Sequence, residues 1–93
     1  MKKVTHDEAN NRFVIEVDGE EAGFAEYAPK DGGVRDFNHT VVDSAYQGQG
    51  LSKILIQEAL DNTKEAGGSI IATCSAVKGF VEKNSQYQDL IEG

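Results

Sequence analysis

The sequence predicts an α+β fold built on a mixed β-sheet. In the first half of the chain, β-branched and aromatic residues alternate with polar ones, which is typical of an antiparallel meander. The second half begins at a glycine turn over residues 47–50 and continues with an apolar pattern of helical period. A βαβ unit and C-terminal helices complete the prediction. With 93 residues, the chain is expected to form a single domain over residues 1–93.

Three strands are predicted before the glycine turn. The first covers residues 12–17 and ends at Asp18-Gly19, a strong hairpin dipeptide. The second covers residues 22–28. A turn cluster at 29–33 separates it from a third strand at 34–42.

Simple alternation assigns the faces of these strands. The region around Val4 could add a further short strand. On the first strand, one face carries Phe13, Ile15 and Val17. On the third strand, one face is expected to carry Arg35, Phe37, His39 and Val41, and the other Val34, Asp36, Asn38, Thr40 and Val42.

The second half predicts two helices around a parallel strand. A helix over 51–66 is closed by Gly67-Gly68, a good C-terminal stop. The apolar run 69–74 should return parallel to the third strand through a right-handed crossover. A helix over 76–83 follows, and a capping-box pattern then opens a last short helix over 85–91.

Composition excludes several classes of function. The formal net charge is −7, which argues against non-specific binding to nucleic acid or to an anionic membrane and suits a cationic partner such as an amine. Cys74 is the single cysteine, so neither an intramolecular disulfide nor a cysteine-rich zinc site is expected, and no metal is assigned. A signal peptide and a membrane span are not expected, and a cytoplasmic location fits.

The glycine turn is the most specific motif of the chain. Backbone N–H groups at a strand–glycine–helix junction converge in front of the helix N-terminus, which favours phosphate. A Walker A loop is excluded because no glycine lies at the required upstream distance. The dinucleotide fingerprint fails because Lys53 occupies the position of its third glycine.

The turn resembles motif A of the Gcn5-related N-acetyltransferases, Gln/Arg-x-x-Gly-x-Gly/Ala. Gln47 and Gly50 match this motif, Tyr46 is the tyrosine that often precedes it, and Ser52 replaces the last small residue. A subgroup of minimal, single-domain members matches more closely, through His39-Thr40, Gln47 to Gly50, Cys74 and Tyr87-Gln88-Asp89-Leu90. The resemblance spans about Phe13 to Leu90 and implies a minimal version of that family's fold.

What the resemblance implies is an acetyl-CoA site. Backbone amides of the turn would bind the pyrophosphate, and the pantetheine arm would pair like an added strand with the end of the third strand. The thioester would then lie close to Val42, whose N–H could polarise the carbonyl. The implied cofactor-binding residues are Thr40, Val41, Val42, Gln47, Gly48, Gln49, Gly50, Leu51, Ser52 and Lys53.

Two residues are candidates for catalysis. His39 could be a general base for an ammonium acceptor, or a histidine whose ring is satisfied by a neighbour. Cys74 could donate a proton to the departing CoA thiolate, form an acetyl-cysteine, or be a small buried hydrophobe. Direct transfer in a ternary complex, as in most of the family, ranks above the covalent route.

Three other aromatic residues receive no catalytic role. The family often uses a tyrosine as general acid on the helix after the parallel strand, but Phe80 stands there and has no ionisable hydroxyl. Tyr87 is expected to pack in the last helix. His6 is expected to lie in a polar, frayed terminus.

The leading hypothesis is therefore an N-acetyltransferase that transfers an acetyl group to a primary amine, either a protein lysine or N-terminus or a small amine. The first half leaves no room for the two helices that wall the acceptor site in larger members, so the acceptor side should be open. The alternatives are a non-catalytic acyl-CoA-binding module and a plain interaction domain. A monomer or a weak dimer is expected.

Overall fold

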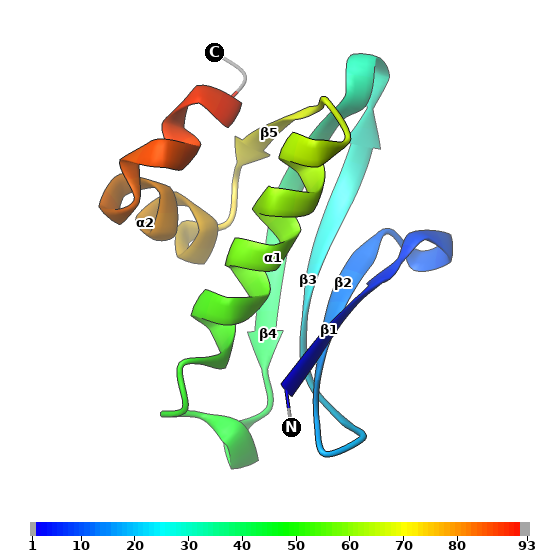
Figure 1. Ribbon diagram of the computed structural model, residues 1–93, viewed down its shortest axis with the longest axis vertical. Helices are drawn as coiled ribbons and strands as arrows, with labels where there is room; N and C mark the ends of the chain where they lie inside the picture. The colour runs from blue at the N-terminus through cyan, green and yellow to red at the C-terminus, as the bar shows by residue number, and fades with distance from the viewer. Residues whose placement is uncertain (1, 92–93) are drawn as a thin grey trace.

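Residues 2–91, which the computed structural model describes, form a five-stranded sheet in which the strands follow one another in chain order (Figure 1). The first four strands pair antiparallel, and the fifth pairs parallel to the fourth. The predicted mixed sheet is thus confirmed. The strands are β1 (Lys2–Asp7), β2 (Arg12–Val17), β3 (Glu20–Lys30), β4 (Val34–Val42) and β5 (Ser69–Ala72).

The antiparallel part of the sheet contains the predicted strands and hairpin turn, with one longer strand. β1 contains Val4, so the additional strand predicted there is present. Asp18 and Gly19 both have positive φ, 52° and 86°, as a tight primed hairpin turn requires. β3 extends beyond the predicted 22–28 and takes in part of the turn cluster, leaving a short 3₁₀ helix at Asp31–Gly33.

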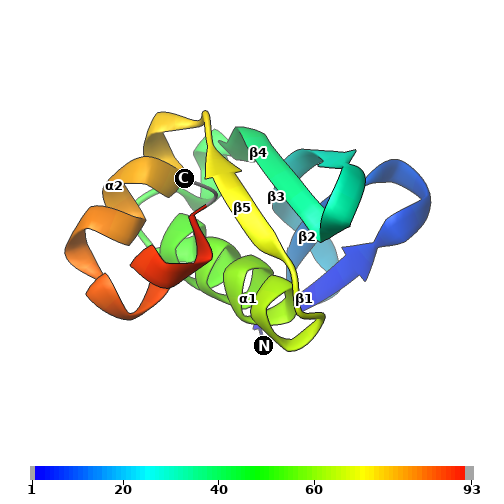
Figure 2. The same cartoon turned by 90° about the horizontal axis from the view of Figure 1, so that it is seen from above.

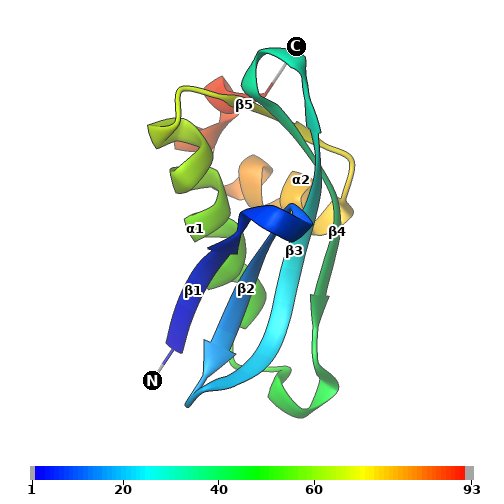
Figure 3. The same ribbon diagram turned by 90° about the vertical axis from the view of Figure 1, so that its right-hand side faces the viewer.

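Two helices lie on one side of this sheet. α1 (Leu51–Glu65) buries one apolar stripe, while α2 (Ser75–Lys83) packs beside α1 near β5. Neither helix covers the opposite face of β2–β4 (Figures 2 and 3). Between α1 and the sheet lie the completely buried side chains of the core, among them Phe13, Ile15, Phe37, Leu51, Leu55, Leu60 and Ile70.

A β-bulge in β4 changes the predicted faces. Glu26 pairs with His39 and Tyr27 pairs with Phe37, so Asn38 is an extra residue without a partner on β3. A bulge of this kind reverses the alternation of the side chains that follow it. Phe37 therefore faces α1, whereas His39 and Val41 face away from it, and the predicted shared face of these three residues is wrong.

The C-terminal part also differs from the prediction. β5 ends at Ala72, and Cys74 is the N-cap residue of α2 rather than the last residue of the strand. The capping box at Ser85 does not form: the 3₁₀ helix Ser85–Leu90 has Asn84 as its N-cap, without a side-chain capping bond. Ile91 forms a bridge to Ile70 instead of continuing a helix.

His6 is ordered rather than frayed. It lies in β1, its ring stacks on Phe13 with centroids 4.1 Å apart, and its Nε2 lies 2.7 Å from the hydroxyl of Tyr27. Burial, and then the charge of Arg35, lower the pKa of His6 below its usual value. The prediction of a polar, unstructured end was wrong because sequence alone did not show the aromatic neighbours.

Candidate active site

The glycine turn connects the end of β4 to α1. After Val42 the chain makes a short 3₁₀ helix, Ser44–Tyr46, in which the Asp43 carboxylate accepts a hydrogen bond from the Ala45 N–H at 2.9 Å. Gly48 and Gly50 follow with φ of 86° and 71°. Their Cβ positions are free of contacts, so the left-handed backbone, and not crowding, is the reason for glycine at these two positions.

The start of α1 presents unused donors. Gly50 is the N-cap, no side chain caps the helix, and the first turn contains no acidic residue. The first N–H groups of a helix have no intrahelical acceptor, and the helix dipole favours negative charge there. One expected donor is already used, because the Gln47 N–H donates to the Ser44 carbonyl at 3.4 Å. The open end of α1 is therefore suited to an anionic group.

A groove connects this turn with β4. It has a volume of about 390 Å³ and is open to solvent. We call it the β4–α1 groove. It is lined by Thr40, Val42, Tyr46, Gln47, Gly48, Gly50, Leu51, Ser52 and Ala76.

The edge of β4 beside this groove carries unpaired backbone. β4 and β5 pair only as far as Phe37 and Ala72, so the rest of β4 has no partner on that side. Asp43 N–H points toward β3, where the Ala22 carbonyl accepts it at 2.7 Å. Because donors alternate along a strand, the N–H groups of Thr40 and Val42 point the other way, into the gap.

Cys74 lies at the inner end of this gap. Its N–H donates to the Phe37 carbonyl at 2.9 Å, and its Sγ lies 3.5 Å from the Thr40 hydroxyl. Burial raises the pKa of this half-buried thiol, but the Thr40 hydroxyl and the backbone amides of Val77, Ala76 and Thr40 outweigh it and bring the pKa below its usual value. The thiol thus lies at the point where β4 and β5 separate, hydrogen-bonded to Thr40.

His39 lies on the other face of the sheet. The bulge at Asn38 turns its exposed ring toward Phe24, with centroids 5.9 Å apart, while Thr40 lines the β4–α1 groove. Val41 shares this outward orientation, so any contact it makes with a ligand in the groove must come from its backbone. The two candidate catalytic residues are therefore on opposite faces, and Cys74 alone adjoins the groove through Thr40.

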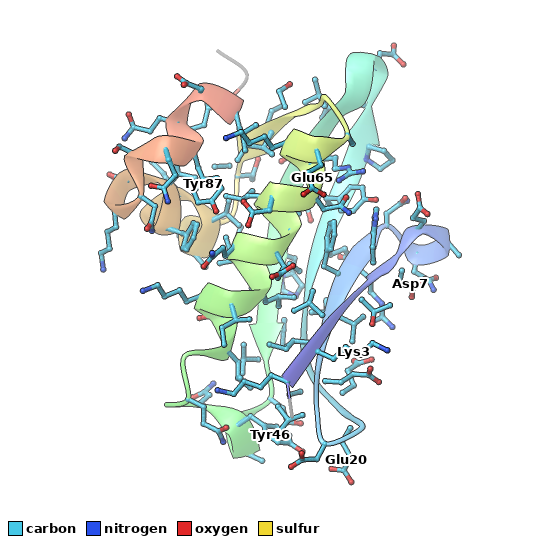
Figure 4. The ribbon with its side chains drawn as sticks, in the orientation of Figure 1. Lys3, Asp7, Glu20, Tyr46, Glu65 and Tyr87 are labelled. Atoms are coloured by element: carbon cyan, nitrogen blue, oxygen red, sulfur yellow. The ribbon has the colours of Figure 1, made fainter. Side chains whose placement is uncertain are left out.

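The aromatic residues near the C-terminus are structural. Phe80 is 8% exposed and packs against Tyr87. The hydroxyl of Tyr87 donates to Asp61 of α1 at 2.7 Å. Figure 4 shows Tyr87 on the C-terminal segment beside α2. Burial and this hydrogen bond raise the pKa of Tyr87 to about 12. Tyr87 thus packs as expected and does not line the groove.

Two features near the groove were not predicted from the sequence. On the outward side of the β4–β5 junction, Thr73 donates to Asp36 at 2.6 Å. On the helix side, a second groove of about 300 Å³ runs between α1 and α2 and contains Lys53 and Lys83. It shares Ser52 and Ala76 with the first groove. Only the tertiary fold brings these residues together, so no local spacing could have indicated them.

The described residues contain neither a metal-binding cluster nor a membrane-spanning helix. Within residues 2–91, no three His, Cys, Asp or Glu side chains gather in a way that could hold a metal ion. No helix in the same range is long and apolar enough to cross a bilayer.

Comparison with known proteins matches most of the chain. Residues 12–90 match the family model described as GCN5-related N-acetyl-transferase. Over 91 residues the chain is 32% identical to Protein NATD1 of Bos taurus and 31% identical to Protein NATD1 of Homo sapiens, covering 95% of this chain and 79% of each relative.

Solved structures share the fold. A GCN5-like candidate N-acetyltransferase from Staphylococcus aureus, solved by NMR, is 29% identical, with a TM-score of 0.73 over 98% of this chain and 88% of its own. The YhbS protein of Escherichia coli, a GNAT family N-acetyltransferase in complex with CoA, has a TM-score of 0.59 at 23% identity, over 83% of this chain and 44% of its own. The second likeness concerns the fold alone.

Proposed function

Because the chain belongs to the GCN5-related N-acetyltransferase family, we propose that it binds acetyl-CoA in the β4–α1 groove and transfers the acetyl group to a primary amine. The observation that carries this proposal is the position of the unpaired edge of β4 next to the open N-terminus of α1. The same groove thus offers backbone N–H donors both for the extended pantetheine arm and for the pyrophosphate of acetyl-CoA.

The pyrophosphate belongs at the glycine turn. The N–H groups from Gly48 to Lys53 are the available donors, and the dipole of α1 stabilises negative charge in front of them. Gln47 is left out because its N–H is already engaged. Ser52 fits in place of the usual glycine or alanine because its side chain is exposed.

With the pyrophosphate at the glycine turn, the other two parts of acetyl-CoA, the pantetheine arm and the adenosine end, extend in opposite directions from it. An arm with amide groups can pair with the Val42 N–H group, as an added strand would, and with the Thr40 N–H group, which also contacts the Cys74 sulfur. Its thioester would then lie between Thr40 and Cys74. At the other end, Lys53 and Lys83 in the α1–α2 groove offer local positive charge for the 3′-phosphate, although the protein as a whole is acidic.

Proton transfer is assigned to Cys74 in preference to His39. In direct transfer the amine attacks the thioester carbonyl, the C–S bond breaks, and the CoA sulfur leaves as a thiolate that needs a proton. The Cys74 thiol can supply that proton, with the Thr40 hydroxyl beside the sulfur that remains, and the proton lost by the attacking nitrogen then returns the Cys74 thiolate to the thiol. His39 lies across the sheet from the groove and can act only on the acceptor side. The covalent acetyl-cysteine route ranks second.

A non-catalytic acyl-CoA-binding module is the second candidate. It is favoured by Phe80, which replaces the tyrosine acid that the family often uses, and by the engagement of the Tyr87 hydroxyl with Asp61. Release of free CoA in the presence of primary amines separates the two functions. A chain that binds acetyl-CoA and releases CoA no faster than an uncatalysed mixture is a binding module.

The binding site is tested by a matched pair of variants. Gly50→Val places a β-branched residue at a φ of 71°, which disturbs the turn, and should weaken acetyl-CoA binding at least about tenfold, or about 1.4 kcal/mol. Gly32→Val creates the same strain at a φ of 79° in the turn between β3 and β4, at the other end of β4 from the groove, where its Cβ is also free of contacts, and should leave binding unchanged. Amide chemical shifts during a titration with acetyl-CoA are the measurement. Equal binding by both variants would refute the site.

A further inference from the structure

Within residues 2–91, no helix covers one face of the sheet. α1 and α2 lie on the other side, as Figures 2 and 3 show. The register places Val14, Phe24 and Val41 next to one another across β2, β3 and β4 on this uncovered side. We call it the open face.

The centre of the open face is apolar, and Phe24 and Val41 are its accessible part, whereas Val14 is only 9% exposed. Val41 is 36% exposed and is among the large hydrophobic residues that the described part of the chain leaves most accessible. Phe24 is half-buried, with the Arg12 guanidinium 5.4 Å from the centre of its ring. A shallow hollow of about 150 Å³ opens between Phe24, Val41, Glu21 and Asp43.

Acidic residues surround this centre. Two of the cations on this face, Lys3 and Arg12, lie in register beside acidic neighbours, and Arg12 is paired with Asp7 at 3.4 Å and Glu21 at 3.7 Å. The third, Lys30, lies at the far end of β3. The carboxylates on or beside the face outnumber these three cations and comprise Asp7, Glu16, Glu21, Glu26, Asp36 and Asp43.

The open face leads to the reaction gap. Asp36 and Thr73 are hydrogen-bonded on its outward side, at the last pairs of the β4–β5 ladder. Cys74 follows Thr73 directly and contacts Thr40 on the groove side. A group that lies on the open face beside Asp36 is therefore close to the point where β4 and β5 separate.

We propose that the open face docks the acceptor, and that the acceptor is a cationic polypeptide segment that presents its lysine or terminal amine to the β4–β5 gap. The inference rests on the proposed function and specifies its substrate class. Apolar side chains of the segment pack on Phe24 and Val41, and its cations face the acidic surround. A second copy of the chain is disfavoured because its open face would bring carboxylates against carboxylates.

The test compares two peptides and two double variants. One short peptide carries a single lysine flanked by arginines, and its partner carries citrulline in place of each arginine. Glu16→Gln/Glu26→Gln removes two charges from the open face. Glu58→Gln/Glu65→Gln makes the same change of charge on the exposed side of α1.

We expect the arginine peptide to shift the amides of Phe24, Glu26, His39 and Val41, with or without CoA, and to bind more weakly as salt rises. The open-face variant should raise the KM or the Kd for this peptide about 3- to 30-fold, as expected for two exposed charge pairs. Two values should not change in this variant. They are the KM for a small primary amine that carries no further charged group and the Kd for acetyl-CoA. The α1 variant should behave as the unmodified protein.

Equal binding of the two peptides, shifts confined to α1, or equal losses in both double variants would overturn the proposal. A different outcome would refute the proposed function and leave the docking surface intact. If the arginine peptide docks on the open face while acetyl-CoA does not bind the groove, the docking surface stands and the transferase does not.

Discussion

The two ends of β4 are held in different ways. Its first half, Val34–Phe37, pairs with strands on both sides. The guanidinium of Arg35 lies 5.2 Å from the ring centre of Tyr27 and donates to Asn62 and Thr63 of α1, both at 2.9 Å. Its second half, His39–Val42, pairs with β3 alone and leaves its other edge to the groove. One strand thus serves as an anchor at one end and as a binding edge at the other.

This difference teaches how a chain of 93 residues accommodates an unpaired edge. Small domains bury a low fraction of their surface and have little stability in reserve. Unpaired backbone is therefore best placed where neighbouring segments are fixed by the core. Phe37, the last residue of β4 that pairs with β5, is almost completely buried, and its carbonyl accepts the hydrogen bond of the Cys74 N–H.

The largest effect is expected at the anchor. Phe37→Ala should lower the free energy of unfolding by about 3–5 kcal/mol, because it removes a large buried ring. Val41→Ala, on the binding half, should change it by less than about 0.5 kcal/mol. Urea unfolding measures both. Similar losses in the two variants would mean that the halves of β4 do not differ in this way.

Arg35→Met should have the next largest effect. It removes two hydrogen bonds and the contacts with the rings of Phe13 and Tyr27, and should lower the free energy of unfolding by about 1–3 kcal/mol. The Thr63 hydroxyl stays satisfied because it also donates to the Ala59 carbonyl. The Kd for acetyl-CoA should stay unchanged below the unfolding transition, and a parallel loss of binding would show that the anchor and the groove are coupled.

On the binding half, Cys74 should alkylate with a pH midpoint below that of an ordinary cysteine, because Thr40 and nearby amides lower the pKa of the thiol. Thr40→Val should move this midpoint upward with little change in stability. The rate of iodoacetamide labelling against pH gives both values. Bound acetyl-CoA should slow the labelling of Cys74. An equal labelling rate with and without acetyl-CoA would mean that the thioester does not lie beside this thiol.

The smallest effect is expected at His6, in the aromatic cluster of the anchor. Its pKa is lower in the folded state than in the unfolded chain, so its contribution to stability is complete above about pH 6.5 and is lost as pH falls through the folded value. Unfolding between pH 7 and the onset of carboxylate titration measures this slope. His6→Gln should flatten it, and an unchanged slope would assign the dependence to other groups.

The elements and their order were predictable because each carries a local signal. Asp18-Gly19 requires positive φ in a tight turn, and Gly67 ends α1 with a φ of 75°. The glycine turn was found for the same reason, since its backbone conformation restricts the residue type. These features depend on neighbours along the chain, which a sequence shows directly.

The site was predictable only in part. The bulge at Asn38 carries no glycine or proline that would indicate it, and it separates His39 from the face predicted for it. The neighbours of Cys74 and His6 come from distant segments, Thr40 in one case and Tyr27 in the other. Long-range packing of this kind cannot be derived from local spacing.

The single extra residue at Asn38 also determines how β4 tolerates change. A strand without a bulge has one alternation of tolerant and intolerant positions along its whole length. β4 has two, shifted by one residue relative to each other. A saturation scan should therefore show a period of two that changes phase at Asn38. Deleting that residue should remove the phase change and leave His39 to Val42 on the faces that they occupy now, because Phe37 and His39 would then pair with the consecutive residues Tyr27 and Glu26.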